Sequence, residues 1–326
     1  RLRPPGFDAY ASTKWLILPR GPWQILLKEE FITVSTRLSD FSKKHDFFVG
    51  IDSDGCVFDS MEIKHKECFC PAFVNHYELQ AVSKYAREVW EFVNLYSTTR
   101  GINRFKAVLR ALSLVEEHPE AKRRGVTPPK LPNLAAWVER ENKLGNPALQ
   151  EEIERTGNEE LKRVMAWSLD VNAAVEKIVR GVPPFPFVRA ALEKMQNDCD
   201  VVVVSQTPLE ALEREWQEQN IDSMAALICG QEMGTKGEHL QGTAGGKYEA
   251  SRILMIGDAP GDLKAAEAVG ACFFPVVPGR EEESWERLLN EGLETFLREQ
   301  YVGSYQEGLL NDFRSALPEH PPWTGA

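Results

Sequence analysis

Short apolar runs, each closed by glycine or polar residues, recur in the second half of the chain and once near residue 50. Between successive runs, apolar residues return at helical spacing. We predict strands near 47–51, 201–204, 225–229, 253–256 and 271–276, and helices at 187–197, 208–220 and 261–269. Strands that alternate with helices in this way are typical of a doubly wound α/β fold with a parallel sheet.

The segment 61–183 has a different pattern, without comparable strand signals. It predicts helices at 76–96, 104–117, 134–143, 147–156 and 158–179. A helical insertion therefore interrupts the α/β unit directly after its first strand. We expect an α/β core at 46–60 and 184–302, the insertion at 61–183, an N-terminal extension at 1–45, and a C-terminal tail at 303–326 that is poorly ordered from Pro318 onward.

Carboxylates follow two of the predicted strands. Asp52 and Asp54, spaced one residue apart and followed by Gly55, come directly after the run at 47–51. Asp258 and Asp262 follow the run at 253–256 in the same manner. Parallel sheets place their ligand crevice at the carboxyl ends of the strands, and a glycine there allows a sharp turn. The pattern indicates a metal-dependent nucleophile with its own acid/base partner.

Two further polar residues lie between these carboxylate pairs. Ser205 is the first polar residue after the run at 201–204, where a buried strand should emerge. It could instead cap the next helix, since Pro208 suits a first helical position. Lys236 opens a predicted helix, and Lys247 is the alternative cation. We favour Lys236 because Lys247 leaves too little chain before Asp258 for a full helix.

These motifs, in this order, resemble the four signature motifs of the haloacid dehalogenase superfamily of phosphatases and phosphotransferases. The resemblance implies a Rossmann-like core covered by an α-helical cap, here the insertion at 61–183. It implies that Asp52 is the nucleophile and that Asp54 is the general acid and base. Ser205 would hydrogen-bond the transferring phosphoryl group, and Lys236 would offset its negative charge.

The same resemblance implies a Mg²⁺ ion. The Asp52 carboxylate, the Asp54 backbone carbonyl and Asp258 would hold it, with Asp262 as a further ligand or a partner of the ligands. Magnesium prefers hard oxygen ligands and keeps several waters, which suits a few carboxylates. We therefore expect a Mg²⁺-dependent phosphomonoester hydrolase that forms an aspartyl-phosphate from a small phosphorylated metabolite.

Alternative functions remain open at this point. Asp54 argues against a dehalogenase, whose leaving halide needs no proton, but it suits a phosphomutase or another phosphotransferase equally well. A phosphonatase would need a cap lysine of lowered pKa, and the candidates are Lys64, Lys66, Lys84 and Lys106. A non-catalytic binding module on the same fold would have no use for both a nucleophile and its acid.

Candidate substrate contacts lie in the core and in the cap. Gln206 and Thr207 directly follow Ser205. In the cap, a glycine-containing break between two helices carries Arg100, Asn103 and Arg104, and arginine's planar fork suits anionic groups. The other reading is an ordinary loop with solvated arginines. A second candidate loop covers 143–147.

Composition narrows the partners. The 326-residue chain has 49 acidic and 38 basic residues, a formal net charge of −11, which repels nucleic acids and anionic membranes. No apolar run approaches the roughly 20 residues that span a bilayer. The six cysteines indicate reduced, mostly buried thiols of a cytoplasmic protein. A zinc site is disfavoured, because the spacing of His65, Cys68, Cys70 and His76 matches no common zinc module. A hairpin is expected at 14–27, and the oligomeric state is left open.

Overall fold

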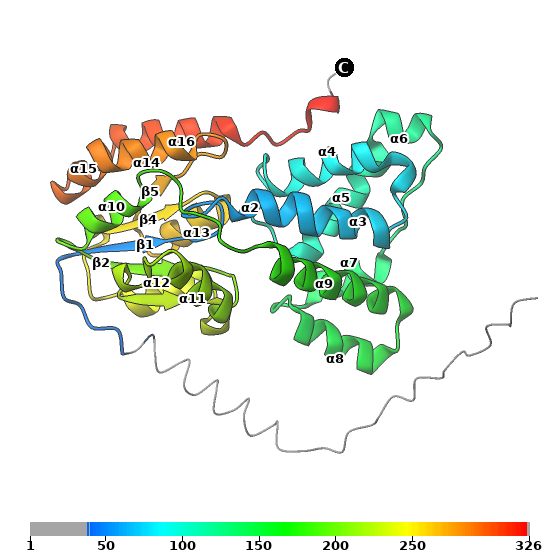
Figure 1. Ribbon diagram of the computed structural model, residues 1–326, viewed down its shortest axis with the longest axis horizontal. Helices are drawn as coiled ribbons and strands as arrows, with labels where there is room; N and C mark the ends of the chain where they lie inside the picture. The colour runs from blue at the N-terminus through cyan, green and yellow to red at the C-terminus, as the bar shows by residue number, and fades with distance from the viewer. Residues whose placement is uncertain (1–37, 39, 325–326) are drawn as a thin grey trace, which may run out of the picture.

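The computed structural model describes residues 38 and 40–324, so the expected hairpin at 14–27 lies outside the described residues. Five parallel strands form one sheet in the order β3-β2-β1-β4-β5 (Figure 1). The strands are β1 (Phe47–Ile51), β2 (Cys199–Val204), β3 (Leu227–Cys229), β4 (Ile253–Gly257) and β5 (Cys272–Pro275). The predicted doubly wound parallel fold is confirmed.

Side chains that alternate along the strands build two apolar layers, one on each face of the sheet. Val49 and Ile51 of β1 belong to one layer, with α10 (Val188–Met195), α14 (Glu281–Arg287) and α15 (Leu293–Leu297). Phe48 belongs to the other, with α12 (Lys236–Thr243) and α13 (Pro260–Ala268). All three β1 side chains are fully enclosed. The sheet is therefore covered on both faces.

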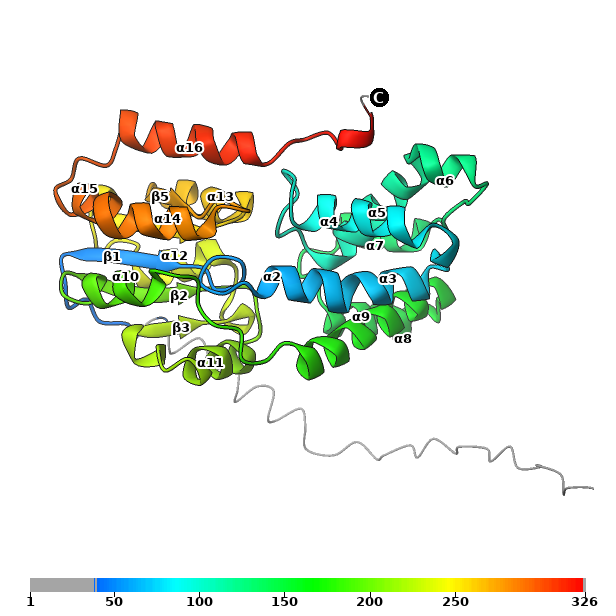
Figure 2. The ribbon, with the colours of Figure 1, turned by 45° about the horizontal axis from the view of Figure 1, so that its top comes forward.

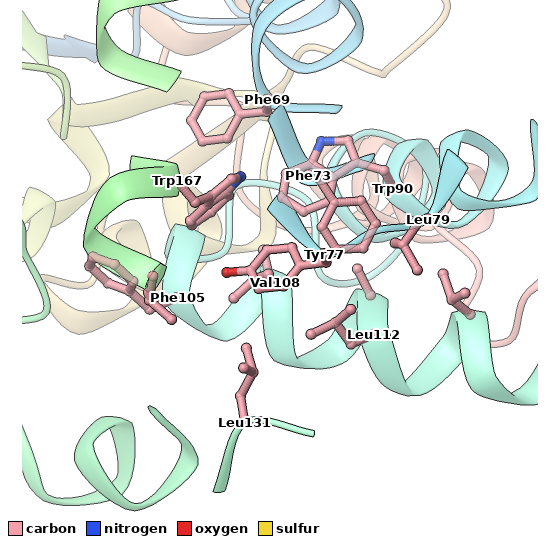
Figure 3. Packing of buried hydrophobic residues seen from close by; sticks show 14 of the residues in the cluster. Phe69, Phe73, Tyr77, Leu79, Trp90, Phe105, Val108, Leu112, Leu131 and Trp167 are labelled. Carbon is pink, nitrogen blue, oxygen red and sulfur yellow. The ribbon is translucent and has the colours of Figure 1, made fainter. Parts of the chain in front are cut away.

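The insertion is helical, as predicted, and lies to one side of the sheet (Figures 1 and 2). It has its own aromatic core, in which Phe69, Phe73, Trp90 and Trp167 pack together (Figure 3). Its helices are α2 (Ser60–Ile63), a π-helical turn (Lys64–Phe69), α3 (Cys70–His76), α4 (Ser83–Asn94), α5 (Arg104–Glu117), α6 (Pro119–Arg123), α7 (Pro132–Arg140), α8 (Asn146–Thr156) and α9 (Glu159–Ile178).

Two chain segments connect this helical cap to the core, and they pair with each other. Phe58, on the way out, forms an antiparallel bridge with Pro184, on the way back. The backbone N–H of Phe185 donates to the carbonyl of Val57 at 2.9 Å. Both crossings therefore lie side by side, directly below the loop that carries Asp52 and Asp54.

The single helix predicted at 76–96 is wrong. The chain leaves α3 at His76, and Glu78 adopts a φ of 58°, which no helix tolerates. A 3₁₀ turn (Gln80–Val82) then leads into α4. Leu79 and Val82 are buried in the turn, so their apolar spacing imitated a helix that does not continue.

The segment expected as a C-terminal tail, 303–326, contains a helix that the sequence prediction did not include. Helix α16 (Ser304–Ala316) and its approach pack along the edge strand β5. The Gln306 side chain accepts from the backbone N–H of Phe273, and the Tyr301 hydroxyl donates to the carbonyl of Phe273, both at 2.9 Å. An exposed strand edge is thereby satisfied.

Residues 318–324, part of the segment expected to be poorly ordered, lie against the cap. The Pro318 carbonyl accepts from the backbone N–H of Thr98 at 3.3 Å, and the Trp323 ring packs against Phe92 and His118. The described residues after α16 thus lead from the sheet to the cap, as Figure 2 shows. Among the described residues, no helix is long and apolar enough to cross a membrane.

Candidate active site

The carboxyl ends of neighbouring strands bring three predicted residues to one edge of the sheet. Asp52 follows β1, Ser205 follows β2 and Asp258 follows β4, and β1 lies between the other two strands. The backbone N–H of Asp52 donates to the carbonyl of Ile256 at 3.0 Å, which extends the ladder to the site itself. All three side chains are buried.

Asp52 is paired with a lysine. The Lys236 ammonium lies 2.7 Å from Asp52 Oδ2 and 2.6 Å from Asp262 Oδ1. Burial raises the pKa of Asp52 well above its usual range, although Lys236 opposes the shift. Lys236 opens α12, as expected, behind a Thr235 capping box. Lys247 donates instead to the carbonyls of Phe41 and Gly242, at 3.0 and 3.2 Å.

Three carboxylates form a candidate metal centre. One oxygen from each of Asp52, Asp258 and Asp262 lies within 4.8 Å of the others. Asp258 Oδ1 is sealed from solvent and has no hydrogen-bond partner, which is costly unless something binds it. Asp262 Oδ2 accepts from the backbone N–H groups of Asp258 and Ala259, at 3.2 and 3.0 Å. Asp262 therefore shapes the loop, Asp52 is held by the Ser53 N–H on Oδ1 and by Lys236 on Oδ2, and Asp258 Oδ1 is the open oxygen.

Gly55 is required by the crowding around this centre. Its φ of 74° lies in the left-handed region. A Cβ at this position would lie 2.5 Å from Asp258 Oδ2 and 2.6 Å from Arg100 Nη2. Any side chain at residue 55 would therefore displace a charged group of the site.

Arg100 lies in the core site, although it comes from the cap. Its Nε and Nη2 lie 2.7 and 2.6 Å from Asp258 Oδ2, and its Nη1 donates to the Leu95 carbonyl at 2.8 Å. Both partners of the ion pair are almost fully enclosed. The cap loop is held close to the core here, since a Cβ on Gly101 would lie 3.0 Å from that of Ala259.

Asp54 has an environment unlike that of Asp52. Its Oδ2 accepts from the Thr207 hydroxyl at 2.6 Å, and its Oδ1 accepts from Ser60 and, at 2.5 Å, from the Lys64 ammonium. Burial alone would raise the pKa of Asp54, but Lys64 and the hydroxyl donors outweigh it and lower the pKa to about 2. Asp54 is therefore a fully hydrogen-bonded carboxylate in this arrangement.

Lys64 and Glu215 complete this second cluster, and sequence analysis missed both roles. Lys64 Nζ lies 3.5 Å from Glu215 Oε1, and Glu215 Oε2 is buried without a partner. Burial would lower the pKa of Lys64, but Asp54 and Glu215 raise it. A Schiff-base lysine needs the opposite shift. Lys64 lies four residues after Ser60, so the two residues share one face of a helix. This spacing is the one sequence signal for their common contact with Asp54.

Ser205 and Gln206, which follow strand β2, form hydrogen bonds with nearby backbone groups. Ser205 Oγ accepts from the backbone N–H of Thr207 at 3.2 Å, which forms a turn before α11 (Leu209–Glu218). Pro208 occupies the cap position of that helix, so Ser205 is not its N-cap. The Gln206 amide donates to the Gly234 carbonyl at 2.8 Å, which ties this turn to the loop before Lys236.

Asn103 and Arg104 lie at the start of α5 in the cap. Asn103 caps this helix by accepting from the backbone N–H of Phe105 at 3.0 Å, and its amide donates to the Leu144 carbonyl. Arg104 Nη1 donates to Ser168 and Asn172 on α9. Neither residue contacts the three carboxylates of the metal centre. Of the three cap candidates, only Arg100 lies in the core site.

Comparison with solved structures gives only remote similarity. The chain is similar to a predicted phosphoglycolate phosphatase from Haemophilus somnus, at 15% identity over 72% of this chain and 86% of that one, with a TM-score of 0.42. It is similar to a haloacid dehalogenase-like family hydrolase from Xanthomonas campestris, at 13% identity over 80% and 98% of the two chains, with a TM-score of 0.43. A hydrolase from Pseudomonas syringae matches at 14% over 76% and 98%, with a TM-score of 0.43.

No family model matches the chain, and no curated protein matches it.

Proposed function

We propose that this protein hydrolyses phosphate monoesters of small metabolites, with Asp52 as the nucleophile. The observation that carries the proposal is the position of the Asp52 carboxylate. It stands at the end of the central strand, in an ion pair with Lys236 and in one cluster with Asp258. A phosphoryl group placed against Asp52 would meet the positive charge that its oxygens require.

The donor set fits Mg²⁺. Asp52, Asp258 and the backbone carbonyl of Asp54 supply hard oxygens, and the sealed, unpartnered Oδ1 of Asp258 is the atom most in need of a cation. When bound, the ion would offset charge on the phosphoryl oxygens and favour the ionised form of Asp52. Arg100 would hold the other Asp258 oxygen in place.

The reaction would proceed by two displacements at phosphorus. An oxygen of Asp52 attacks, the bond from phosphorus to the ester oxygen breaks, and Asp54 gives that oxygen a proton. A water that loses its proton to Asp54 then attacks the aspartyl-phosphate. The bond between phosphorus and Asp52 breaks, and inorganic phosphate leaves. Ser205 would hydrogen-bond the phosphoryl group, and Lys236 would neutralise it.

Asp54 needs a proton before it can act as the acid. Its pKa of about 2 reflects Lys64 and the two hydroxyls rather than its burial. Ser60 and Lys64 belong to the first cap helix and the turn after it, so a shift of that segment would remove two of the three donors. We infer that cap movement on substrate entry sets the protonation of Asp54.

Turnover of an aryl phosphate by the full chain tests this proposal. Release of inorganic phosphate should require added Mg²⁺, should stop with excess chelator, and should be inhibited by Ca²⁺, whose coordination is larger and looser. Full activity in chelator would contradict the metal assignment. Tight binding of phosphate esters without any turnover would instead support the non-catalytic alternative.

A phosphomutase or another phosphotransferase remains the second candidate. It would pass the phosphoryl group from Asp52 to a substrate hydroxyl rather than to water. Supplying an acceptor alcohol during turnover separates the two functions, since a transferase would give less free phosphate than alcohol product. A phosphonatase is disfavoured because Lys64, the buried cap lysine at the site, is held protonated.

The predicted partners are unchanged by the structure. An acidic protein with a small cluster of local cations suits a small phosphorylated metabolite, and we expect neither nucleic acid nor a membrane as partner.

A further inference from the structure

One cation near the site has no counter-charge. Arg100, Lys236 and Lys64 each form an ion pair with a carboxylate. Arg104, in contrast, contacts only neutral groups of the described residues: the Ser168 carbonyl and hydroxyl and the Asn172 amide oxygen. Burial without a compensating charge lowers the pKa of Arg104 to about 10. Arg104 is only half-buried, and a cation of this kind without an acidic partner is available to pair with an anionic ligand.

The open edge of Arg104 has the geometry of an anion receptor. Its neutral partners all bind Nη1, at 2.7 to 3.3 Å. Nε and Nη2 have no partner among the described residues, and neither atom is sealed from solvent. These two nitrogens form the fork that binds a carboxylate or phosphate through two parallel hydrogen bonds. The inner side of the guanidinium is thus anchored while the outer side is open.

His65 supplies a second donor beside this fork. Its Nδ1 accepts from the indole N–H of Trp90 at 3.2 Å, which places the ring hydrogen on Nε2. Burial, reinforced by nearby Arg100, lowers the pKa of His65 to about 3, so the ring is neutral at physiological pH. Nε2 is not sealed from solvent and has no partner among the described side chains.

Both donors contact the same aromatic ring. The His65 ring stacks on Phe69 with centroids 4.8 Å apart and 21° between planes, and the Arg104 guanidinium lies 5.0 Å from the same Phe69 ring. Phe69 is itself fixed by Trp90 and Trp167 in the aromatic core of the cap (Figure 3). The pair is therefore built on rigid packing rather than on a loop.

This pair lies near the proposed catalytic residues. Lys64, the chain neighbour of His65, lies 2.5 Å from Asp54. Asp54, Lys64, Arg100 and Arg104 are all close enough to His65 to influence its titration. The pair accordingly lies on the cap side of the space that borders Asp54.

We infer that Arg104 and His65 bind a second anionic group of the substrate, at the end remote from the phosphoryl group that Asp52 attacks. The inference rests on the proposed hydrolase function and narrows its substrate class to phosphate esters that carry a second anionic oxygen group, a carboxylate or a second phosphate. A neutral sugar phosphate would leave the Arg104 charge without a counter-charge.

A matched substrate series tests this class. Phosphorylated hydroxy acids of increasing chain length are compared with their carboxamides and with the corresponding bisphosphates, as kcat/KM under Mg²⁺. For the best chain length, the acid or the bisphosphate should exceed the amide by roughly 10- to 100-fold, the range of a charged hydrogen bond. If the acid shows the larger preference over the amide, the second anionic group is a carboxylate; if the bisphosphate does, it is a phosphate.

Variants assign that preference to the pair. Arg104→Gln should bring the ratio of acid to amide close to one, and because this readout is a ratio, any loss of turnover common to both substrates cancels. Arg104→Lys keeps the charge without the fork, so the ratio of acid to amide should fall only partly. This variant provides the test if Arg104→Gln does not fold. Arg110→Gln, on the exposed face of the same helix, is the matched control and should change nothing.

Failure of the inference is distinguishable from failure of the proposed function. An aryl phosphate that is hydrolysed while every acid and amide pair reacts equally overturns the anion site and leaves the hydrolase intact, as does a ratio that survives in Arg104→Gln. If no ester is hydrolysed, calorimetry can measure the affinities of Asp52→Asn for the acid and for the amide. Their ratio gives the same preference without turnover. Equal binding of the two would overturn the inference there as well.

Discussion

Asp52 and Asp54 are two residues apart, yet their surroundings differ completely. Asp52 shares its space with two other carboxylates and one lysine, all from the core. Asp54 is surrounded by donors, and two of them, Ser60 and Lys64, come from the first helical turns of the cap. The pKa of Asp52 is raised and that of Asp54 is lowered.

The difference separates two tasks. The Asp52 cluster has excess negative charge, which suits a metal-assisted nucleophile, and its carboxylates are all positioned by the core, with Arg100 as its one contact from the cap among the described residues. The Asp54 cluster is balanced by Lys64, so its proton affinity depends on where the cap lies. We infer that the core fixes the site of attack and that the cap controls the proton.

The largest expected effect comes from the Asp52 cluster. Asp258→Asn removes a proposed metal ligand and leaves Arg100 buried without its partner. We expect activity to fall by at least roughly 10²-fold and stability to fall by about 3–5 kcal/mol. Chemical denaturation and phosphate release measure the two losses. Adding Arg100→Met should restore much of the stability and none of the activity; a double variant as unstable as the single one would contradict the pairing.

Removal of the acid should discriminate between leaving groups. Asp54→Asn is expected to lower kcat by about 10²–10⁴-fold for an alkyl phosphate, whose alkoxide needs a proton. A nitrophenyl phosphate, whose leaving group is stable as an anion, should lose much less in its first step. Burst kinetics isolate that step. Equal loss for both esters in the first step would remove Asp54 from the acid role.

Disruption of the cap contact to Asp54 should have a smaller effect. Lys64→Met leaves Asp54 and Glu215 buried near each other without a cation, so we expect a loss of about 3 kcal/mol at neutral pH, at the lower end for a broken buried ion pair. The pKa of Asp54 should rise, and the pH–rate profile should move upward with it. The control is Lys66→Met, which changes a half-exposed lysine two residues further along the chain. An unchanged profile would separate Lys64 from the proton.

The smallest expected effect is the pH dependence that Glu215 adds. Burial raises its pKa to about 7 from the ordinary 4.5, so the folded protein holds this proton more tightly than the unfolded chain. Its contribution is therefore fully favourable below about 4.5 and is lost as pH rises toward 7. Glu215→Gln should flatten the decline of stability in that window, as measured by denaturation between these pH values. An unchanged slope would place its titration elsewhere.

The core and its first two carboxylates were predictable because strand runs and parallel topology determine them. Once β1 and β4 are neighbours, Asp52 and Asp258 must meet at their carboxyl ends. The choice of Lys236 over Lys247 followed from chain length, and the structure places Lys236 at Asp52.

Contacts between the cap and the core could not be predicted in the same way. Arg100 and Asp258 are 158 residues apart in the sequence. Neither segment contains a pattern that predicts how the cap is oriented on the core. Lys64 meets Asp54 ten residues away, and the helical spacing of Ser60 and Lys64 aligns these two residues without identifying the carboxylate they share. The C-terminal helix was a different kind of miss, because the spacing of Leu309, Phe313 and Leu317 was readable as an apolar stripe.

Mass spectrometry of the protein, acid-quenched during turnover of an aryl phosphate, tests the central assignment most directly. We predict that a fraction of the chain gains the mass of one phosphoryl group, that borohydride reduction maps it to Asp52, and that Asp52→Asn neither gains the label nor turns over. Sustained turnover with a label on another residue, or undiminished activity of Asp52→Asn, would contradict the account.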